Sequence, residues 1–284
     1  QLLSCEKKDI RGIKAINSGL TNRSFRFCVG DKQYVYRYHG SGTEKFINRD
    51  GEAKTMQIVS KLGLDDTFIY MDPKIGWKVS RFISNARELG YHTPEDVASA
   101  IGMIRRLHDA NISVDYEFNV WNKVEEFIHR LREEQRFDFD NAQKHYEMLR
   151  QVKEYVLADG YSRACLCHND CYSPNFLVDE QGKMYLIDWE YSGTDDPASD
   201  LGTFICCSDY SFEEAAQLIR QYLGHEPSEG ELNHYFGYVA IAAYYWYVWA
   251  LYQEVKGNPM GEWLYLWHTY SLQYAKKALR YFQA

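Results

Sequence analysis

The chain has 284 residues, a formal net charge of −8 at pH 7 and a sequence pI of about 5.6. Hydrophobic residues make up 45% and charged residues 25% of it, ordinary globular values that exclude a disordered, collagen-like or low-complexity chain. The acidic balance, without a basic stripe in the sequence, argues against binding to nucleic acid. The aromatic content of 7 Trp, 24 Tyr and 14 Phe is high and needs an explanation.

Residues 1–83 are expected to form strands and one helix. Residues 24–29 and 33–38 alternate apolar and polar side chains around a Gly-Asp pair, a pattern that predicts a β-hairpin. Residues 49–63 have apolar side chains near helical spacing and end in glycine, which predicts a helix. Residues 77–83 predict a further strand.

The rest of the chain is expected to be mainly helical. A Thr-Pro-Glu-Asp run at residues 93–96 is a helix start signal, because it offers a capping residue, a first-turn proline and two acids. Further helices are expected at residues 121–131 and 142–157. The exception is a pair of short apolar segments around an Asp-Glu-Gln-Gly turn, which predicts a hairpin of residues 176–178 and 184–187.

The predicted fold class is therefore α+β. A small β-rich N-terminal lobe with one helix is expected at residues 1–83. A larger, mainly helical C-terminal lobe is expected at residues 84–284.

The seven cysteines include two close pairs, Cys165/Cys167 and Cys206/Cys207. Disulfide frameworks are typical of short secreted chains, and no signal-peptide pattern opens the printed sequence, so we expect reduced thiols in a cytoplasmic protein. Residues 235–253 carry no charge, but their central Trp and Tyr residues belong at bilayer interfaces rather than the midplane. A buried helix of a water-soluble domain is expected there, not a membrane span.

The loop before the predicted hairpin carries the most informative polar residues. Asp170 and Asn175 are five residues apart on this loop, and Asp188 follows the second strand. Because a hairpin folds back on itself, we expect these three side chains to converge. One Asp could accept a proton, and an Asn/Asp pair offers the oxygen ligands that Mg²⁺ prefers. This is the minimal apparatus for phosphoryl transfer.

Two other kinds of site use residues of this loop, a zinc cluster and a hydrolase site. Cys165, Cys167, His168 and Cys171 could form a zinc cluster, but the spacing lacks a C-x-x-C pair and a second half. Cys171 and His168 could serve a hydrolase, but no nucleophile elbow surrounds them. Both readings are disfavoured, and the cysteines are interpreted as small apolar fillers.

The loop resembles the catalytic loop of the small-molecule kinases of the protein-kinase-like superfamily. The resemblance rests on His-Asn-Asp at residues 168–170, on Asn175, and on the Ile-Asp-Trp-Glu run around Asp188. Asn169 is typical of choline and ethanolamine kinases, whereas aminoglycoside phosphotransferases typically have Gly at this place. Over nearly its whole length the chain resembles the bacterial choline kinases of the LicA type.

The resemblance implies a two-lobed protein-kinase-like fold, ATP as phosphoryl donor, and phosphorylation of the hydroxyl group of choline. It implies that Asp170 orients the hydroxyl and takes its proton, and that His168 belongs to the catalytic residues by stabilising the loop. Asn175 and Asp188 would hold Mg²⁺, and ATP would bind between the lobes.

The N-terminal lobe adds to this resemblance. Residues 17–25 resemble the loop that covers the phosphates, and Arg37 stands where protein kinases have a strand lysine. An Arg suits this place because its planar fork can hold phosphate oxygens and stays charged. Glu52 would be the ion-pair partner of Arg37. Nucleotide contacts are implied for Ser18, Thr21, Asn22, Phe25, Arg37, Glu52, Phe82 and Ile83.

The acceptor site is expected to be aromatic. The quaternary ammonium group of choline cannot donate hydrogen bonds and is held by aromatic faces. Trp246 and Trp249 are three residues apart on one helical face and resemble the W-x-x-W segment that supplies the cage in choline kinases. The further implied substrate contacts are Asp170, Tyr191, Asp200 and Tyr270, with Tyr274 as another candidate. One departure is Cys207, at a place where many choline kinases have Glu.

Several alternatives stay open at this point. The acceptor could instead be ethanolamine, thiamine or an aminoglycoside, and the chain could be a non-catalytic kinase-like binding module. The module is disfavoured because Asp170, Asn175 and Asp188 are all present. The expected partners are ATP and a small-molecule substrate, and the sequence does not indicate an oligomeric state.

Overall fold

The computed structural model describes residues 2–16, 23–39, 47–137 and 141–283. The chain divides into two compact units. The first unit contains residues 1–107 and 174–193, and the second contains residues 108–173 and 194–284. This grouping differs from the consecutive segments expected at 1–83 and 84–284, and the roles assigned to those segments stay predictions.

The first unit contains a five-stranded antiparallel sheet with the strand order β1-β2-β3-β5-β4. The predicted hairpin is confirmed, with Val29 opposite Lys32 and Gly30 in the left-handed region that such turns require. Strands β1 and β4 lie outside the predicted ranges, and the side chains of β1 are almost all exposed, so no alternation marks it. The strands are β1 Ile10–Ile16, β2 Arg23–Val29, β3 Lys32–Tyr38, β4 Phe68–Met71 and β5 Lys78–Arg81.

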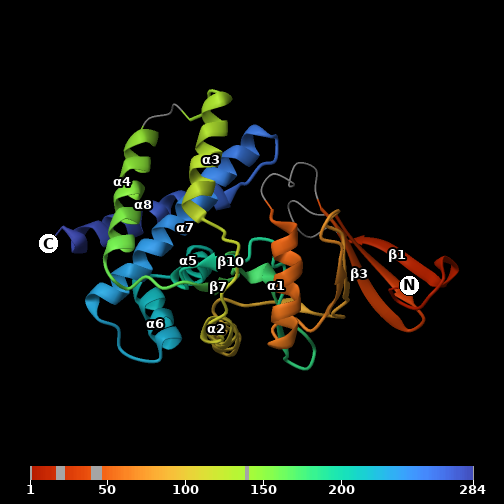
Figure 1. Ribbon diagram of the computed structural model, residues 1–284. Coiled ribbons are helices and arrows are strands. Elements are labelled where there is room, and N and C mark those ends of the chain that lie inside the picture. Colours follow the sequence, from red (N-terminus) through yellow and green to blue (C-terminus); the bar gives the residue numbers. More distant parts are fainter. Residues whose placement is uncertain (1, 17–22, 40–46, 138–140, 284) are drawn as a thin grey trace. The chain divides into compact units, whose positions relative to one another are not determined.

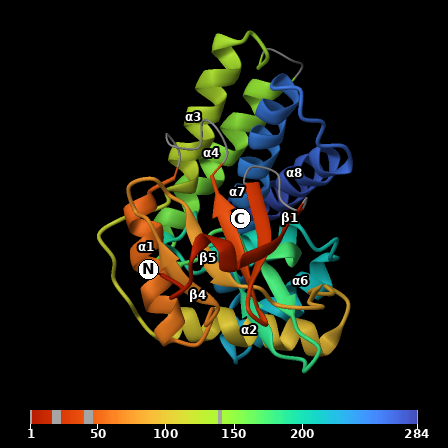
Figure 2. The same cartoon turned by 90° about the vertical axis from the view of Figure 1, so that its right-hand side faces the viewer.

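Helix α1, Arg49–Lys61, confirms the predicted helix of the first unit. It begins where the Asn48 side chain accepts a hydrogen bond from the backbone N–H of Gly51, and it packs against β4 (Figure 2). The second predicted hairpin is also confirmed, as β8 Phe176–Val178 and β9 Met184–Leu186, and β6 Arg87–Glu88 pairs with β8. A short 3₁₀ helix, η1, spans Lys7–Asp9.

The second unit is built mainly of helices. Helix α2, Pro94–Asp109, starts at the predicted Thr-Pro signal, and its last two residues belong to this unit. Two short strands, β7 Cys165–Cys167 and β10 Gly193–Asp195, pair with each other. The other helices are α3 Val120–Glu133, α4 Ala142–Ala158, α5 Ala198–Cys206, α6 Phe212–Leu223, α7 Glu229–Val255 and α8 Glu262–Phe282.

Helix α7 is the centre of the second unit. It packs against α3, α4, α5, α6 and α8, and Figure 1 shows α3, α4 and α8 alongside it. Its side chains are buried around the whole circumference, so the uncharged run of residues 235–253 is explained by packing. Among the described residues, no helix combines the length and the hydropathy that crossing a membrane would take. All seven cysteines lie in the described ranges and are free thiols.

Candidate active site

The β8–β9 hairpin of the first unit carries the two predicted metal ligands, Asn175 and Asp188, at one of its ends. Phe176 lies opposite Leu186, and the backbone N–H of Ile187 donates to the carbonyl oxygen of Asn175 at 2.9 Å. Asn175 and Asp188 therefore flank the same end of the hairpin. Asp188 has a positive φ of 69°, a conformation that Asp tolerates better than most residues. An amide and a carboxylate with an exposed portion fit the oxygen donor set that Mg²⁺ takes in proteins.

Asp188 also belongs to a set of five charged side chains, which we call the charged cluster: Arg37, Glu52, Lys78, Asp188 and Glu190. The guanidinium of Arg37 is forked, donating through Nη1 to Asp188 and through Nη2 to Glu190. The ammonium of Lys78 donates to Oε1 of Glu52 at 2.9 Å and lies 3.8 Å from Oδ1 of Asp188. Lys78 stands directly opposite Arg37 in the β3–β5 register.

The expected ion pair between Arg37 and Glu52 needs correction. Glu52 bonds to Lys78, while Arg37 bonds to Asp188 and Glu190. Two cations that oppose each other on adjacent strands both need carboxylates, and the cluster supplies them from different parts of the first unit. Burial opposes the charge of Arg37, but the attraction of Asp188, Glu190 and Glu52 outweighs it and holds the pKa of Arg37 above its ordinary value.

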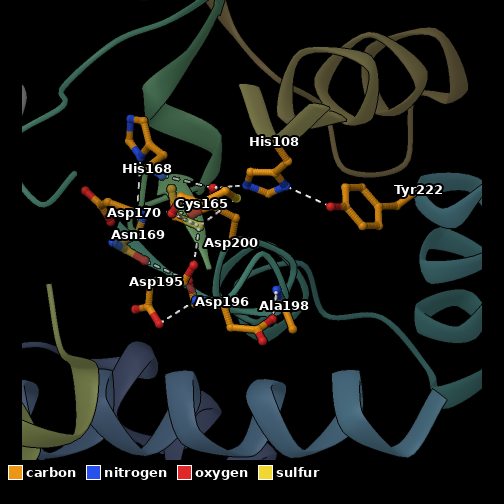
Figure 3. Close-up of polar contacts among 12 residues, drawn as sticks. His108, Cys165, His168, Asn169, Asp170, Asp195, Asp196, Ala198, Asp200 and Tyr222 are labelled. Atoms are coloured by element: carbon orange, nitrogen blue, oxygen red, sulfur yellow. Dashed lines mark hydrogen bonds and ion pairs between the residues drawn. The ribbon is translucent and has the colours of Figure 1, made fainter. Parts of the chain in front are cut away.

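In the second unit, the carboxylate of Asp200 anchors the loop of residues 168–170 (Figure 3). Asp200, on α5, accepts hydrogen bonds from the backbone N–H groups of His168 at 3.0 Å and Asn169 at 2.6 Å, and from Nε2 of His108 at 3.0 Å. Asn169 has a φ of 63°, which turns the chain sharply before Asp170. The backbone N–H of Asp170 donates to Nδ1 of His168 at 3.2 Å. These bonds fix the turn that presents Asp170.

A chain of hydrogen bonds leads from Arg163 through Tyr222 and His108 to Asp200. Arg163 donates to the phenol oxygen of Tyr222 at 2.8 Å, and the Tyr222 hydroxyl lies 2.8 Å from Nδ1 of His108. Since the Asp200 carboxylate can only accept, His108 donates to it through Nε2–H, while Nδ1 of His108 shares its hydrogen bond with Tyr222. Burial favours the neutral form of Asp200, but the bond and charge of His108, with His168, outweigh it and keep the pKa of Asp200 below its usual range.

The geometry bears on the predicted roles of Asp200 and His168. The side chain of Asp200 is 0% exposed and accepts three donors, so it has no surface to offer a substrate, and the prediction of a substrate contact is corrected to a structural role. The ring of His168 is fully buried as well, and its Nδ1 accepts from the loop backbone. This burial fits the expectation that His168 stabilises the loop, and the role stays a prediction.

Three indole rings of the second unit form what we call the tryptophan cluster: Trp246, Trp249 and Trp267. The rings of Trp246 and Trp249 lie 5.5 Å apart at 86°, in an edge-to-face contact. Trp267, on α8, lies 5.8 Å from Trp246 and 6.4 Å from Trp249. It was missed by the sequence reading, although its spacing of four from Trp263, which stacks on it at 5.1 Å, is a signal of a shared helix face.

The tyrosines predicted as candidate substrate contacts are Tyr191, Tyr270 and Tyr274, and within the described residues the rings of the last two contact each other but no ring of the tryptophan cluster. Tyr270 donates its hydroxyl to the backbone oxygen of Tyr210 at 2.9 Å, and its ring stacks on Tyr274 at 5.6 Å. Tyr191 is half-buried and belongs to the first unit. Cys207 is buried at the end of α5.

The other predicted nucleotide contacts lie in the first unit. Phe25 is half-buried in β2 opposite Tyr36. The backbone N–H of Phe82 donates to the backbone carbonyl oxygen of Gln33 at 3.0 Å, and Ile83 beside it is half-buried. The remaining three, Ser18, Thr21 and Asn22, lie outside the described residues.

The buried cysteines form no zinc site of the spacing considered above. Within the described ranges, the group of His and Cys side chains close enough to share a metal is His108, Cys165 and Cys167, whose ligand atoms lie within 4.8 Å of one another. Both ring nitrogens of His108 are already bonded, to Tyr222 and Asp200. Burial raises the pKa of the Cys167 thiol, which opposes the thiolate that zinc requires.

The sequence is similar to one family of kinases. Residues 13–283 match the profile of the choline/ethanolamine kinase family. The chain is 24% identical over 256 residues to protein LicA of Haemophilus influenzae, covering 86% of this chain and 74% of that protein. It is 27% identical over 292 residues to human ethanolamine kinase 1, covering 85% of this chain and 62% of that protein.

Solved structures give the same picture of the fold. Choline kinase LicA from Streptococcus pneumoniae superposes with a TM-score of 0.77 at 24% identity, over 96% of this chain and 93% of that chain. A spectinomycin phosphotransferase superposes with a TM-score of 0.61 at 14% identity, over 95% of this chain and 93% of that chain. These likenesses confirm the predicted fold class, an α+β fold of the protein-kinase-like type.

Proposed function

Because the chain belongs to the choline/ethanolamine kinase family, we propose that it transfers the γ-phosphoryl group of ATP to the hydroxyl group of choline, giving phosphocholine and ADP. The observation that carries the choice of choline is the tryptophan cluster, in which three indole rings meet at 5.5 to 6.4 Å. Indole faces are the strongest partners for a quaternary ammonium. The seven free thiols fit a reducing cytoplasm, where we expect the enzyme to act.

In the proposed mechanism, Asp170 is the base. Its carboxylate orients the choline hydroxyl and takes the proton as the bond to phosphorus forms. The geometry that supports this role is the anchoring of His168 and Asn169 by Asp200, which fixes the backbone on the N-terminal side of Asp170. Positioning of this kind supplies most of the catalysis in phosphoryl transfer.

The charged cluster is proposed to serve the phosphates. The guanidinium of Arg37 can donate to phosphate oxygens when it exchanges its hydrogen bond to Asp188 or Glu190 for one to phosphate. Asn175 and Asp188 are proposed to hold Mg²⁺, which would neutralise charge on the phosphates when bound. Glu190, missed by the sequence reading, orients Arg37 from the other side of the fork.

The competing acceptor is ethanolamine. A primary ammonium carries three donors and prefers carboxylates or carbonyl oxygens to aromatic faces. Trp246, Trp249 and Trp267 are aromatic and bring no carboxylate, which favours the quaternary ammonium. Cys207, at a place where many choline kinases have Glu, is a departure from the choline kinases and adds nothing to this preference.

The test is ATP turnover by the wild-type chain on choline, ethanolamine, thiamine and kanamycin, together with Asp170→Asn. Choline should have the highest kcat/KM, and Asp170→Asn should lower kcat on choline by about 10²- to 10⁴-fold while binding of Mg·ADP persists. The matched control is Asp31→Asn, in the exposed turn of the β2–β3 hairpin, which should leave kcat unchanged. No turnover of choline, or a near-normal rate for Asp170→Asn, would refute the proposal.

A further inference from the structure

The charged cluster contains a lysine that the proposed mechanism does not use. Lys78 lies on β5 directly opposite Arg37 on β3. Side chains of directly opposite residues in an antiparallel pair share a face of the sheet, and like charges in such a pair repel each other. Two neighbouring cations are therefore maintained only because carboxylates reach both of them.

The contacts of Lys78 bridge two carboxylates. Its ammonium donates to Glu52 of α1 at 2.9 Å and lies 3.8 Å from the Oδ1 atom of Asp188. The same Oδ1 accepts from Arg37, so Asp188 is shared by both cations. Lys78 thus connects helix α1, strand β5 and the residue that follows the β8–β9 hairpin.

The exposure of these side chains separates two possible roles. The side chain of Lys78 is 10% exposed and that of Glu52 is 4% exposed, whereas that of Asp188 is 25% exposed. Asp188 can reach a ligand, but the ammonium of Lys78 is largely covered by its two carboxylates. A direct phosphate contact would require Lys78 to leave Glu52 as an unpaired buried charge, which is costly.

We propose that Lys78 is a positioning residue of the phosphoryl-transfer site: by bridging Glu52 and Asp188, it sets the orientation in which Asp188 receives Mg²⁺. This inference rests on the proposed function, because it takes Asp188 as a metal ligand. Groups that orient a metal ligand from outside affect metal affinity nearly as much as the ligands do. Lys78 therefore acts through Asp188 and makes no contact with the nucleotide.

The test uses a charge-balanced double variant, Lys78→Met with Glu52→Gln. It removes one positive and one negative charge, so a changed response to Mg²⁺ reports orientation rather than net charge. Calorimetry measures ADP binding as a function of Mg²⁺ concentration, and thermal melting of the metal-free protein reports folding. We expect the Mg²⁺ concentration for half-maximal ADP binding to rise about tenfold, with ADP binding in the absence of Mg²⁺ unchanged.

A second variant and a control complete the experiment. Lys78→Arg keeps the charge and therefore the fold, and its larger planar head should shift the Mg²⁺ dependence in the same direction by about threefold. Lys183→Met removes an exposed lysine that pairs with Asp66 at 2.7 Å in the same unit, and it should change nothing.

Two results would overturn the inference. The first is wild-type Mg²⁺ dependence in both Lys78 variants, or in Lys78→Arg alone should the double variant not melt cooperatively. The second is weaker ADP binding without Mg²⁺, which would mean that Lys78 contacts phosphate directly. ADP binding requires no acceptor, so a failure of choline as substrate would leave this result interpretable.

Discussion

The charged cluster of the first unit is buried except for half-buried Arg37 and Asp188, the tryptophan cluster of the second unit is buried, and different interactions hold the two clusters. In the charged cluster each charge has an opposite charge at bonding distance. In the tryptophan cluster the rings meet through faces and edges, and the indole N–H of Trp267 has no hydrogen-bond partner within the described residues. The first arrangement depends on exact pairing, while the second depends on filled volume, since none of the three tryptophans is more than 7% exposed.

The largest effect should come from breaking one pair of the charged cluster. Glu52→Gln leaves the buried ammonium of Lys78 without its 2.9 Å partner, and we expect the free energy of unfolding to fall by about 3 kcal/mol. Urea unfolding measures it. Asp50→Asn on the same helix removes an exposed partner of Lys54 and should cost about 0.5 kcal/mol. Equal losses in the two variants would remove the distinction between buried and exposed pairs.

A ring-for-ring change in the tryptophan cluster should be milder for stability and specific for the acceptor. Trp249→Phe keeps an aromatic face of smaller area, so we expect a loss of about 1 kcal/mol in the free energy of unfolding. The KM for choline should rise about tenfold, because a weaker cation–π contact loses on the order of 1 kcal/mol, while the KM for ATP stays unchanged. The matched control is Trp121→Phe, which changes a tryptophan of α3 that contacts the ring of Tyr146 on α4 and should leave the KM for choline unchanged. An unchanged KM for choline would assign Trp249 to packing alone.

The smallest effects concern two buried histidines of the second unit, one among rings and one between carboxylates. Burial first, with the charges of His268 and Lys276, lowers the pKa of His145 to about 3. The unfolded chain therefore takes up a proton that the folded chain refuses, and stability should fall as pH drops below about 6.5. The slope is at most about 1.4 kcal/mol per pH unit. Urea unfolding at pH 7.0 and 5.5 should show less acid sensitivity for His145→Gln than for the wild type.

His234 should behave in the opposite way. Burial alone would lower its pKa, but hydrogen bonds and charges from Asp196 and Asp159, the latter at 2.9 Å, raise it above the ordinary value. Its contribution is complete below about pH 6.5 and is lost as pH rises through the raised pKa. His234→Asn should therefore flatten the stability curve above pH 6.5 and leave the acid side unchanged. A flattened acid side would contradict this sign.

Local sequence predicted those elements whose determinants are local. The Gly-Asp and Asp-Glu-Gln-Gly turns predicted both hairpins, and the Thr-Pro start predicted α2. The position of Asn175 and Asp188 at the same end of the second hairpin followed from its turn. The partners within the charged cluster could not be obtained this way, because Glu190 reaches Arg37 across 153 residues and Lys78 reaches Glu52 across 26.

The roles of some residues depend on their burial, which their residue type alone does not reveal. Asp200 was predicted from resemblance, yet whether it serves the substrate or the loop depends on exposure, which a single sequence does not reveal. Trp267 was overlooked because an aromatic residue on a packed helix has the same pattern whether it binds a ligand or only fills the core.

The burial of helix α7 around its whole circumference affects local unfolding in the second unit. A helix with no polar face has no side that tolerates water, so none of its neighbours can detach without exposing apolar surface. Local opening of α3, α4, α5 or α8 is thereby coupled to the same central helix. Amide hydrogens along α7 are consequently expected to exchange with solvent only when the unit unfolds as a whole.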